Sequence, residues 1–95
     1  YNQICYLNPN LFNKNLINLK RVDLSYNNLR SIENFTFQNL ISLTYLDISN
    51  NQLNKFFPTS FFNLSNLEYL GLANNQIKRI EKYIFEYFTN LFYLG

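Results

Sequence analysis

Apolar residues recur along the chain with a constant period. The pattern L-x-x-L-x-L-x-x-N-x-L begins every 24 residues, at Leu19, Leu43 and Leu67, and its first residues occur again at Leu91. Apolar and polar positions alternate in the first half of each copy of the pattern, which predicts a strand of about three to five residues. Successive strands run in the same direction, so they must pair in parallel, with a crossover segment between them. A constant period in this range is typical of a stacked solenoid.

The segments between the predicted strands carry two further apolar columns. The first column is Phe12, Phe37, Phe61 and Phe85, and the second is Leu16, Leu40, Leu64 and Phe88. The spacing of the two columns predicts one short helical turn in each segment, packed back over the strands. One extra residue separates Phe12 from Leu16 in the first unit. We interpret both columns as core on the convex side, in preference to a cofactor site.

The period divides the chain into units without an internal linker. We expect a partial repeat at 1–18, complete repeats at 19–42, 43–66 and 67–90, and a truncated repeat at 91–95, all within one domain. Neither end carries the polar capping unit that covers the terminal core of a solenoid. We therefore expect the chain to be an excerpt from a longer array, with neighbouring repeats at both ends.

An asparagine occupies the same slot after each predicted strand, at Asn27, Asn51 and Asn75. The chain must turn out of the strand at this slot, which holds backbone N–H and C=O groups away from water. An unpaired group there would cost about 1–3 kcal/mol, whereas an amide side chain supplies both a donor and an acceptor. We therefore predict a structural ladder of hydrogen bonds through these side chains, and contact with a ligand is the alternative role.

The pattern, followed by phenylalanine and leucine at fixed offsets, resembles leucine-rich repeats, and residues 46–53 (LDISNNQL) lie almost on the family consensus. The 24-residue length and the phenylalanine column are similar to the subclass common in extracellular receptors and matrix proteins. The resemblance implies an α/β solenoid, or horseshoe, with a concave parallel β-sheet and a convex side of loops and short helical turns. It also implies binding of proteins, glycans, lipids or nucleic acids, usually through the concave sheet.

Strand alternation identifies the side chains that face a partner. Arg21, Tyr45, Tyr69 and Tyr93 should form one row across the sheet, because adjacent parallel strands lie about 4.8 Å apart. An arginine beside a tyrosine ring allows a cation–π contact. The row is explained either by packing of aromatic residues on a sheet or by a platform of anchors for a partner. The candidate ligand-binding residues are Arg21, Asp23, Tyr26, Tyr45, Asp47, Glu68, Tyr69, Phe92 and Tyr93.

The predicted face changes along the array. Toward Tyr69, Gly71 and Ala73 it becomes flatter and more apolar, so we predict that a partner contacts the carboxyl-terminal half. Asp23 and Asp47 should lie opposite one another on neighbouring strands. They are interpreted as exposed polar residues, with a carboxylate pair for acid–base work or cation binding as the alternative.

The net charge of +2 is too small to favour a nucleic-acid or membrane-surface partner. A basic edge follows the asparagine turn and consists of Arg30, Lys55, Lys78 and Arg79. We interpret it as solvated, with contact to a glycan or another polyanion as the alternative. No apolar run approaches the roughly 18 residues of a membrane span. Sequons for N-glycosylation begin at Asn34 and Asn63, about as many as chance produces from 18 asparagines and 10 serines or threonines.

Catalytic residue types are scarce. The chain has no histidine, and its single cysteine, Cys5, is either a free thiol or paired outside this sequence. We expect no enzymatic activity, no cofactor and no metal, because no cluster has metal-ligand spacing. We interpret the chain as a protein-binding module from the ectodomain of a receptor or matrix-type protein, extracellular or at the cell surface. The first alternative is an intracellular scaffold or adaptor, and the second is part of an enzyme whose chemistry lies elsewhere.

Overall fold

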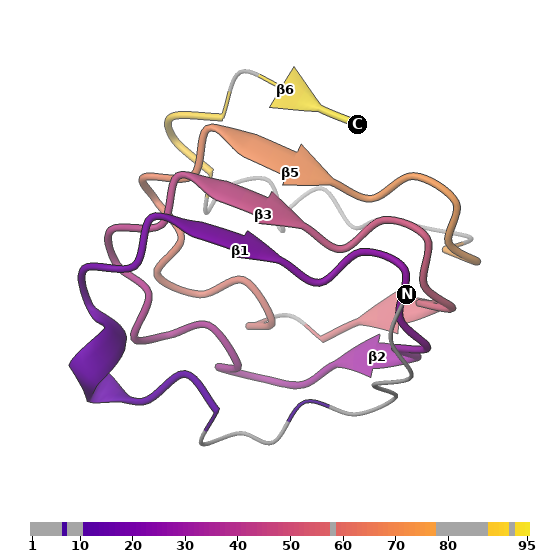
Figure 1. The fold of residues 1–95 in the computed structure, drawn as a ribbon, viewed down its shortest axis with the longest axis horizontal. Helices are drawn as coiled ribbons and strands as arrows, with labels where there is room; N and C mark the ends of the chain where they lie inside the picture. Colours follow the sequence, from indigo (N-terminus) through magenta and orange to yellow (C-terminus); the bar gives the residue numbers. More distant parts are fainter. Residues whose placement is uncertain (1–6, 8–10, 58, 78–87, 92) are drawn as a thin grey trace.

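The strands predicted from the period form one parallel sheet in the computed structural model, which describes residues 7, 11–57, 59–77, 88–91 and 93–95. The sheet consists, in spatial order, of β1 (Arg21–Asp23), β3 (Tyr45–Asp47), β5 (Tyr69–Gly71) and β6 (Tyr93–Leu94) (Figure 1). Each strand pairs with the equivalent segment of the next repeat, so that Arg21 lies opposite Tyr45 and Tyr45 opposite Tyr69. The prediction of a parallel solenoid is confirmed.

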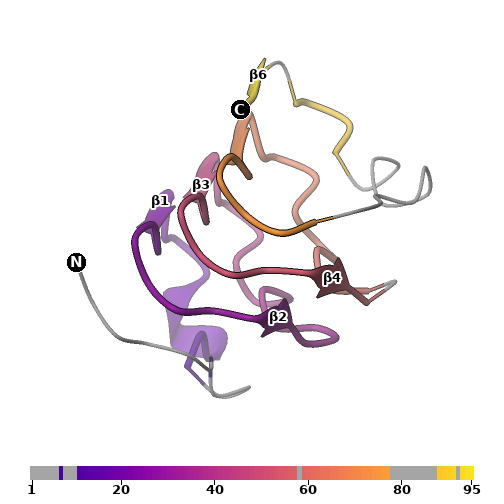
Figure 2. The ribbon, with the colours of Figure 1, turned by 90° about the vertical axis from the view of Figure 1, so that its right-hand side faces the viewer.

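A second, two-stranded sheet lies across the coil from the first (Figures 1 and 2). It consists of β2 (Ser31–Ile32) and β4 (Lys55–Phe56), which pair in parallel. The sequence predicted only loops and turns on this side. The two strands were missed because each is two residues long, and so short a segment shows no alternation of apolar and polar positions.

The crossover segments turn through short hydrogen-bonded loops. The Leu40 N–H donates to the Phe37 carbonyl (3.0 Å), and the next unit repeats this bond, which confirms the predicted turn between the two apolar columns. In the first unit the turn is η1, a 3-10 helix at Lys14–Leu16 with Asn13 as its N-cap. This helix accommodates the extra residue that follows Phe12.

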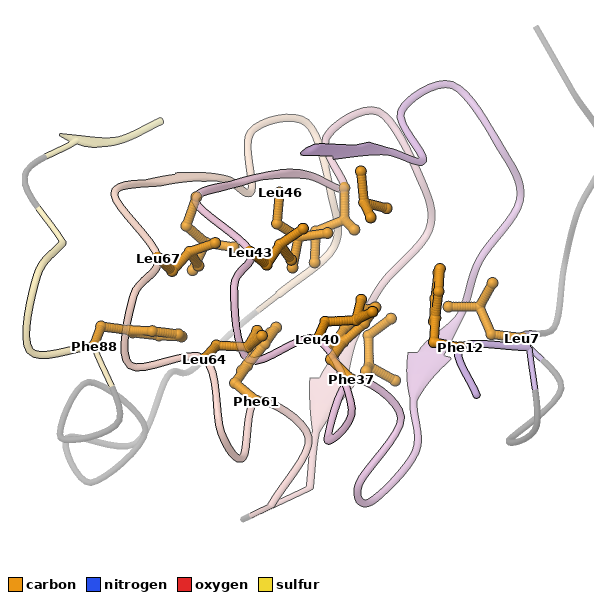
Figure 3. Packing of buried hydrophobic residues seen from close by; sticks show 14 of the residues in the cluster. Leu7, Phe12, Phe37, Leu40, Leu43, Leu46, Phe61, Leu64, Leu67 and Phe88 are labelled. Atoms are coloured by element: carbon orange, nitrogen blue, oxygen red, sulfur yellow. The ribbon is translucent and has the colours of Figure 1, made fainter. Parts of the chain in front are cut away.

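The core is a continuous stack of apolar side chains inside the coil (Figure 3). Leu46 of β3 is fully buried, as are Leu43 and Ile48 on either side of it. At the Ile48 position of the neighbouring units, Leu24 and Leu72 are partly buried and pack against the same core. The Phe37 ring centroid lies 5.6 Å from that of Phe12 and 6.2 Å from that of Phe61. Each buried ring contributes about 1.5–3 kcal/mol of apolar burial. Phe85, the last predicted member of the column, lies outside the described residues.

The turn after each strand contains a left-handed backbone position at the same slot. The φ angles of Tyr26, Asn50 and Asn74 are 57°, 56° and 56°. Asparagine tolerates this conformation, whereas a bulky residue such as Tyr26 rarely adopts it. Backbone bonds between units hold the turn: the Tyr26 N–H donates to the Ser49 carbonyl (3.2 Å) and the Asn50 N–H to the Ala73 carbonyl (2.9 Å).

Candidate functional site

We call the solvent-facing side of the four-stranded sheet the concave face, and its centre is a stacked row of side chains. The guanidinium carbon of Arg21 lies 3.7 Å from the ring centroid of Tyr45. The rings of Tyr45 and Tyr69 stack with centroids 4.4 Å apart and planes 6° apart. Strand pairing places the three residues side by side, because they are Cα partners on adjacent strands. Both faces of the Tyr45 ring are therefore covered, and the ring presents its edge to solvent.

Asp23 and Asp47 lie opposite one another on β1 and β3, and each carboxylate bonds within its own turn. Asp23 Oδ1 accepts from the Ser25 N–H (3.0 Å) and hydroxyl (2.6 Å), and Asp47 makes the same two bonds with Ser49. The bond from the Ser25 hydroxyl, then that from its backbone N–H, hold the pKa of Asp23 below its ordinary 3.8, and the Arg21 charge acts in the same direction. The two serines were not among the predicted site residues. The repeated D-x-S spacing could have identified them, because it is typical of local side-chain turns.

Gly71 occupies the third position of the row that Asp23 and Asp47 begin. A Cβ added at Gly71 would lie 2.7 Å from Asp47 Oδ1 and 3.2 Å from Tyr69 Cε1. The Asp47 carboxylate and the Tyr69 ring therefore lie against the Gly71 backbone, which is buried. The sequence predicted a flatter and more apolar surface here. It could not show that a side chain from the preceding unit fills the position.

The other candidate residues lie around the stacked row. Tyr26 is 50% exposed and follows the end of β1, and Glu68 is exposed immediately before β5. The Tyr93 backbone pairs with Tyr69, but the Tyr93 side chain and all of Phe92 lie outside the described residues. The structure thus gathers the stacked row and the two aspartates at the centre of the face and places Tyr26 and Glu68 at opposite strand ends.

The turn out of each strand is held by the side chains of Asn27, Asn51 and Asn75. The Asn51 amide N–H groups donate to the carbonyls of Leu24 (3.0 Å) and Ile48 (3.0 Å). Asn51 Oδ1 accepts from the buried Leu29 N–H (3.0 Å). Asn75 makes the equivalent bonds one unit later. These bonds join one unit to the next, so they fix the stacking of the coils and with it the strand register of the concave face.

A family model described as leucine rich repeat matches residues 1–53, 17–77 and 41–95, which together span the chain. The chain belongs to the leucine-rich repeat family. Among solved structures, a chain in the crystal structure of a TLR13–ssRNA13 complex superposes with a TM-score of 0.91 and 31% identity over 98% of this chain. The leucine-rich repeat chain spans 13% of the length of that chain. No curated protein matches the sequence significantly.

The sequons of this leucine-rich repeat chain lie in crossover segments, away from the concave face. Asn34 and Asn63 are both exposed. Asn34 Oδ1 accepts a hydrogen bond from the Thr59 hydroxyl (2.6 Å). The Asn63 amide N–H donates to the Gln38 carbonyl (2.8 Å). The two amides are therefore held in opposite ways, Asn34 through its oxygen and Asn63 through its nitrogen.

Little of the predicted basic edge is described. Arg30 is exposed, whereas the side chain of Lys55 and all of Lys78, Arg79 and Cys5 lie outside the described residues. Within the part of the chain that the structure describes, no three His, Cys, Asp or Glu side chains are grouped to hold a metal ion. The same part contains no helix with the length and apolar character to cross a membrane.

Proposed function

We propose that this leucine-rich repeat module binds a protein ligand through its concave face, as part of the ectodomain of a receptor or matrix-type protein. The observation that carries the proposal is the stacked row, in which Tyr45 is held between Arg21 at 3.7 Å and Tyr69 at 4.4 Å. A ring held on both faces loses little conformational freedom when a partner binds, so more of its contact energy appears as affinity. Tyrosine and arginine are also among the side chains that most often dominate protein interfaces.

The Tyr45 hydroxyl can form a specific hydrogen bond with a partner of the stacked row. It has no hydrogen-bond partner among the described residues. A partner that approaches the ring edge meets this hydroxyl, which can donate one bond and accept another. Peptide groups and polar side chains supply the matching atoms. Stacking of nucleic-acid bases needs an open ring face, and both faces of Tyr45 are covered.

The charges of the concave face also favour a protein over a polyanion. Its described residues include the carboxylates of Asp23, Asp47 and Glu68 and the cations of Lys20 and Arg21. A phosphate chain is bound through clusters of lysine and arginine that release its counterions. The TLR13 chain is in complex with ssRNA, so RNA is the class of ligand that the experiment must separate from protein.

The likeness to a Toll-like receptor chain supports the receptor part of the proposal. The match covers 98% of this chain at 31% identity. The constant repeat length and the buried phenylalanine column, seen in the subclass common among extracellular receptors, support the same interpretation. On this proposal the module is extracellular or faces an endosomal lumen, and the whole protein transmits a signal after its ligand binds.

The proposal is tested with a partner captured from extracellular fluid and then purified, so that its Kd can be measured. Tyr45→Phe keeps the stacked ring and deletes only the hydroxyl. We expect it to weaken binding about fivefold without changing the unfolding midpoint, because one hydrogen bond contributes about 1 kcal/mol. Tyr45→Ala combined with Tyr69→Ala should weaken binding more than about tenfold.

The matched control is Ile41→Ala, which changes a side chain that is 48% exposed on the crossover side. It should leave the Kd within about twofold of the wild-type value. Wild-type affinity in both row variants would refute binding through the concave face. A single-stranded RNA that binds tightly, with an affinity that falls steeply as salt rises, would assign the module to polyanion recognition instead.

A further inference from the structure

Two phenylalanines are exposed on the crossover side, outside both the concave face and the core. Phe35 is 44% exposed and Phe62 is 37% exposed. Their ring centroids lie 5.5 Å apart with planes at 89°, an edge-to-face pair. The loops that carry them are joined by Thr59, whose carbonyl accepts from the Phe35 N–H (3.0 Å) and the Phe62 N–H (3.3 Å). The pair is therefore a fixed aromatic surface that shows much of its area to solvent.

Phe35 also has an unfavourable backbone. Its φ is 59°, a left-handed conformation that bulky side chains rarely adopt and that glycine or asparagine would adopt more readily. The core does not require this ring, because the fully buried Phe37 supplies the aromatic side chain of that unit. An exposed ring on a strained backbone is best explained by a group that covers it.

Each phenylalanine of the pair is the sequence neighbour of a sequon asparagine. Asn34 directly precedes Phe35, and Asn63 directly follows Phe62. Asn34 Oδ1 is held by the Thr59 hydroxyl at 2.6 Å, and its amide nitrogen makes no hydrogen bond to another described residue. The amide nitrogen of Asn63 instead donates to the Gln38 carbonyl at 2.8 Å. Attachment of a sugar at Asn34 therefore leaves every described hydrogen bond intact.

We propose that Asn34 carries an N-linked glycan whose first N-acetylglucosamine packs against the Phe35–Phe62 pair. The inference depends on the proposed extracellular function, because only a chain that enters the secretory pathway meets the N-glycosylation machinery. The C–H groups on a pyranose face are apolar and weakly positive, and they complement the negative face of an aromatic ring. The sugar would cover the exposed rings and the strained loop together.

The attachment step balances with a lipid-diphosphate-linked oligosaccharide as donor. The bond between the sugar C1 and the diphosphate oxygen breaks, a bond between C1 and Asn34 Nδ2 forms, and Nδ2 loses one proton as the lipid diphosphate leaves. The Thr36 hydroxyl of the sequon is buried and donates to the Glu33 carbonyl (2.9 Å) in the folded chain. Transfer therefore precedes folding of this loop.

The test uses the protein secreted from a glycosylating host, with occupancy of each sequon read by peptide mass spectrometry. Three forms are compared by thermal unfolding: the intact glycoprotein, the protein trimmed by an endoglycosidase to its first sugar, and the unglycosylated protein from a host without the machinery. We expect the first two to unfold within about 1 °C of each other. The unglycosylated form should unfold about 4 °C lower, because only the first sugar contacts the rings.

Phe35→Leu combined with Phe62→Leu removes the ring faces but keeps the apolar bulk. In this double variant the difference between the trimmed and unglycosylated forms should fall below about 1 °C. Comparison of glycoforms within one variant cancels the effect of the substitutions on stability alone. Ile41→Ala, which changes another exposed apolar side chain on the crossover side, should retain the full difference.

Three results would overturn the assignment: an unoccupied Asn34 in the secreted protein, an undiminished glycan effect in the double leucine variant, or an effect abolished by Asn63→Gln and retained in Asn34→Gln. Failure of the proposed extracellular function is distinguishable from these. It would appear as a protein that carries no glycan when isolated from its own cells, although the secreted protein shows the coupling to the rings.

Discussion

Asn51→Ala removes the central side chain of the asparagine ladder. Asn51 is 7% exposed. Its nitrogen donates to the carbonyls of Leu24, Ile48 and Ser49 at 3.0–3.1 Å, and its oxygen accepts from the Leu29 N–H at 3.0 Å. Alanine can make none of these bonds. The substitution therefore tests whether the ladder stabilises the stacking of the coils.

The loss can be estimated group by group. The Leu24 and Ile48 carbonyls each keep a second amide donor, from Asn27 at 2.9 Å and Asn75 at 3.0 Å. The Leu29 N–H belongs to a fully buried residue and is left without its acceptor. An unsatisfied buried donor costs about 1–3 kcal/mol, so this group dominates. With the lost donor bonds, we expect Asn51→Ala to lower the free energy of unfolding by about 3 kcal/mol.

The assay is urea unfolding followed by circular dichroism, with Asn54→Ala as the matched control. Asn54 is exposed, and its side chain makes no hydrogen bond to another described residue. The same chemical change there should alter stability by no more than about 0.5 kcal/mol. If the two variants have equal free energies of unfolding, the ladder does not stabilise the fold and the reasoning is wrong.

Asn51→Asp separates the acceptor role from the donor role. Aspartate still accepts from Leu29, but its carboxylate faces the three carbonyls that the Asn51 amide contacts. Burial and these dipoles should raise the pKa of the introduced carboxyl in the folded state. Relative to wild type, the variant should be most stable below the ordinary aspartate pKa of about 3.9 and lose stability as pH rises through the raised value. A difference from wild type that does not change with pH would contradict this.

Four further predictions concern the concave face and the core. Gly71→Ala should lower stability by about 1 kcal/mol by displacing the Asp47 carboxylate. Most of this loss should disappear in an Asp47→Ala background, where only the Tyr69 ring still lies close to the added methyl, and a double-mutant cycle of urea midpoints measures the difference. Phe61→Ala should lower the free energy of unfolding by about 3–5 kcal/mol, because the Phe61 ring packs against three other rings at centroid distances of 4.9–6.2 Å. A loss below about 1.5 kcal/mol in the same assay would contradict this packing. The lowered pKa of Asp23 contributes stability above 3.8 that is lost as pH falls through the lowered value, so the advantage of wild type over Asp23→Asn should shrink on acidification. Ser25→Ala should return the pKa of Asp23 toward 3.8, as followed by NMR titration, and an unchanged pKa would exclude the Ser25 bonds as its cause.

The period alone predicted most of the fold, because a constant spacing fixes strand position, pairing direction and register together. Tyr45 lies opposite Tyr69 for the same reason that Leu46 lies opposite Leu70: the members of each pair are one repeat apart. Burial of the phenylalanine column follows from the same regularity. The two-residue strand at Ser31–Ile32 could not be predicted, because its pairing arises from the stacking of the coils and not from an alternating pattern.

Side-chain detail within the candidate site was less accessible from the sequence. Strand alternation identified the stacked row and the neighbouring aspartates, because the face of the sheet to which a side chain points depends only on its position along the strand. The contact of Asp47 with Gly71 depends on a rotamer that Ser49 holds through two hydrogen bonds. Sequence position does not specify rotamers. The exposed Phe35 was missed for a related reason, since its direction depends on a left-handed backbone that no pattern signalled.

The hydrogen bonds that the asparagine side chains make between coils determine which changes in chain length the fold can tolerate. After duplication or loss of one whole repeat unit, each ladder asparagine would still lie against a carbonyl equivalent to that of Leu24 in the preceding unit. Every later coil would keep its register. Insertion of a single residue in a strand would reverse the side chains that follow it and separate each later amide from its carbonyl. The outer loops are more permissive, as the extra residue accommodated by η1 demonstrates. Such a protein should therefore diversify by copying whole units and by drift in its outer loops, while the length of its inner strands stays constant.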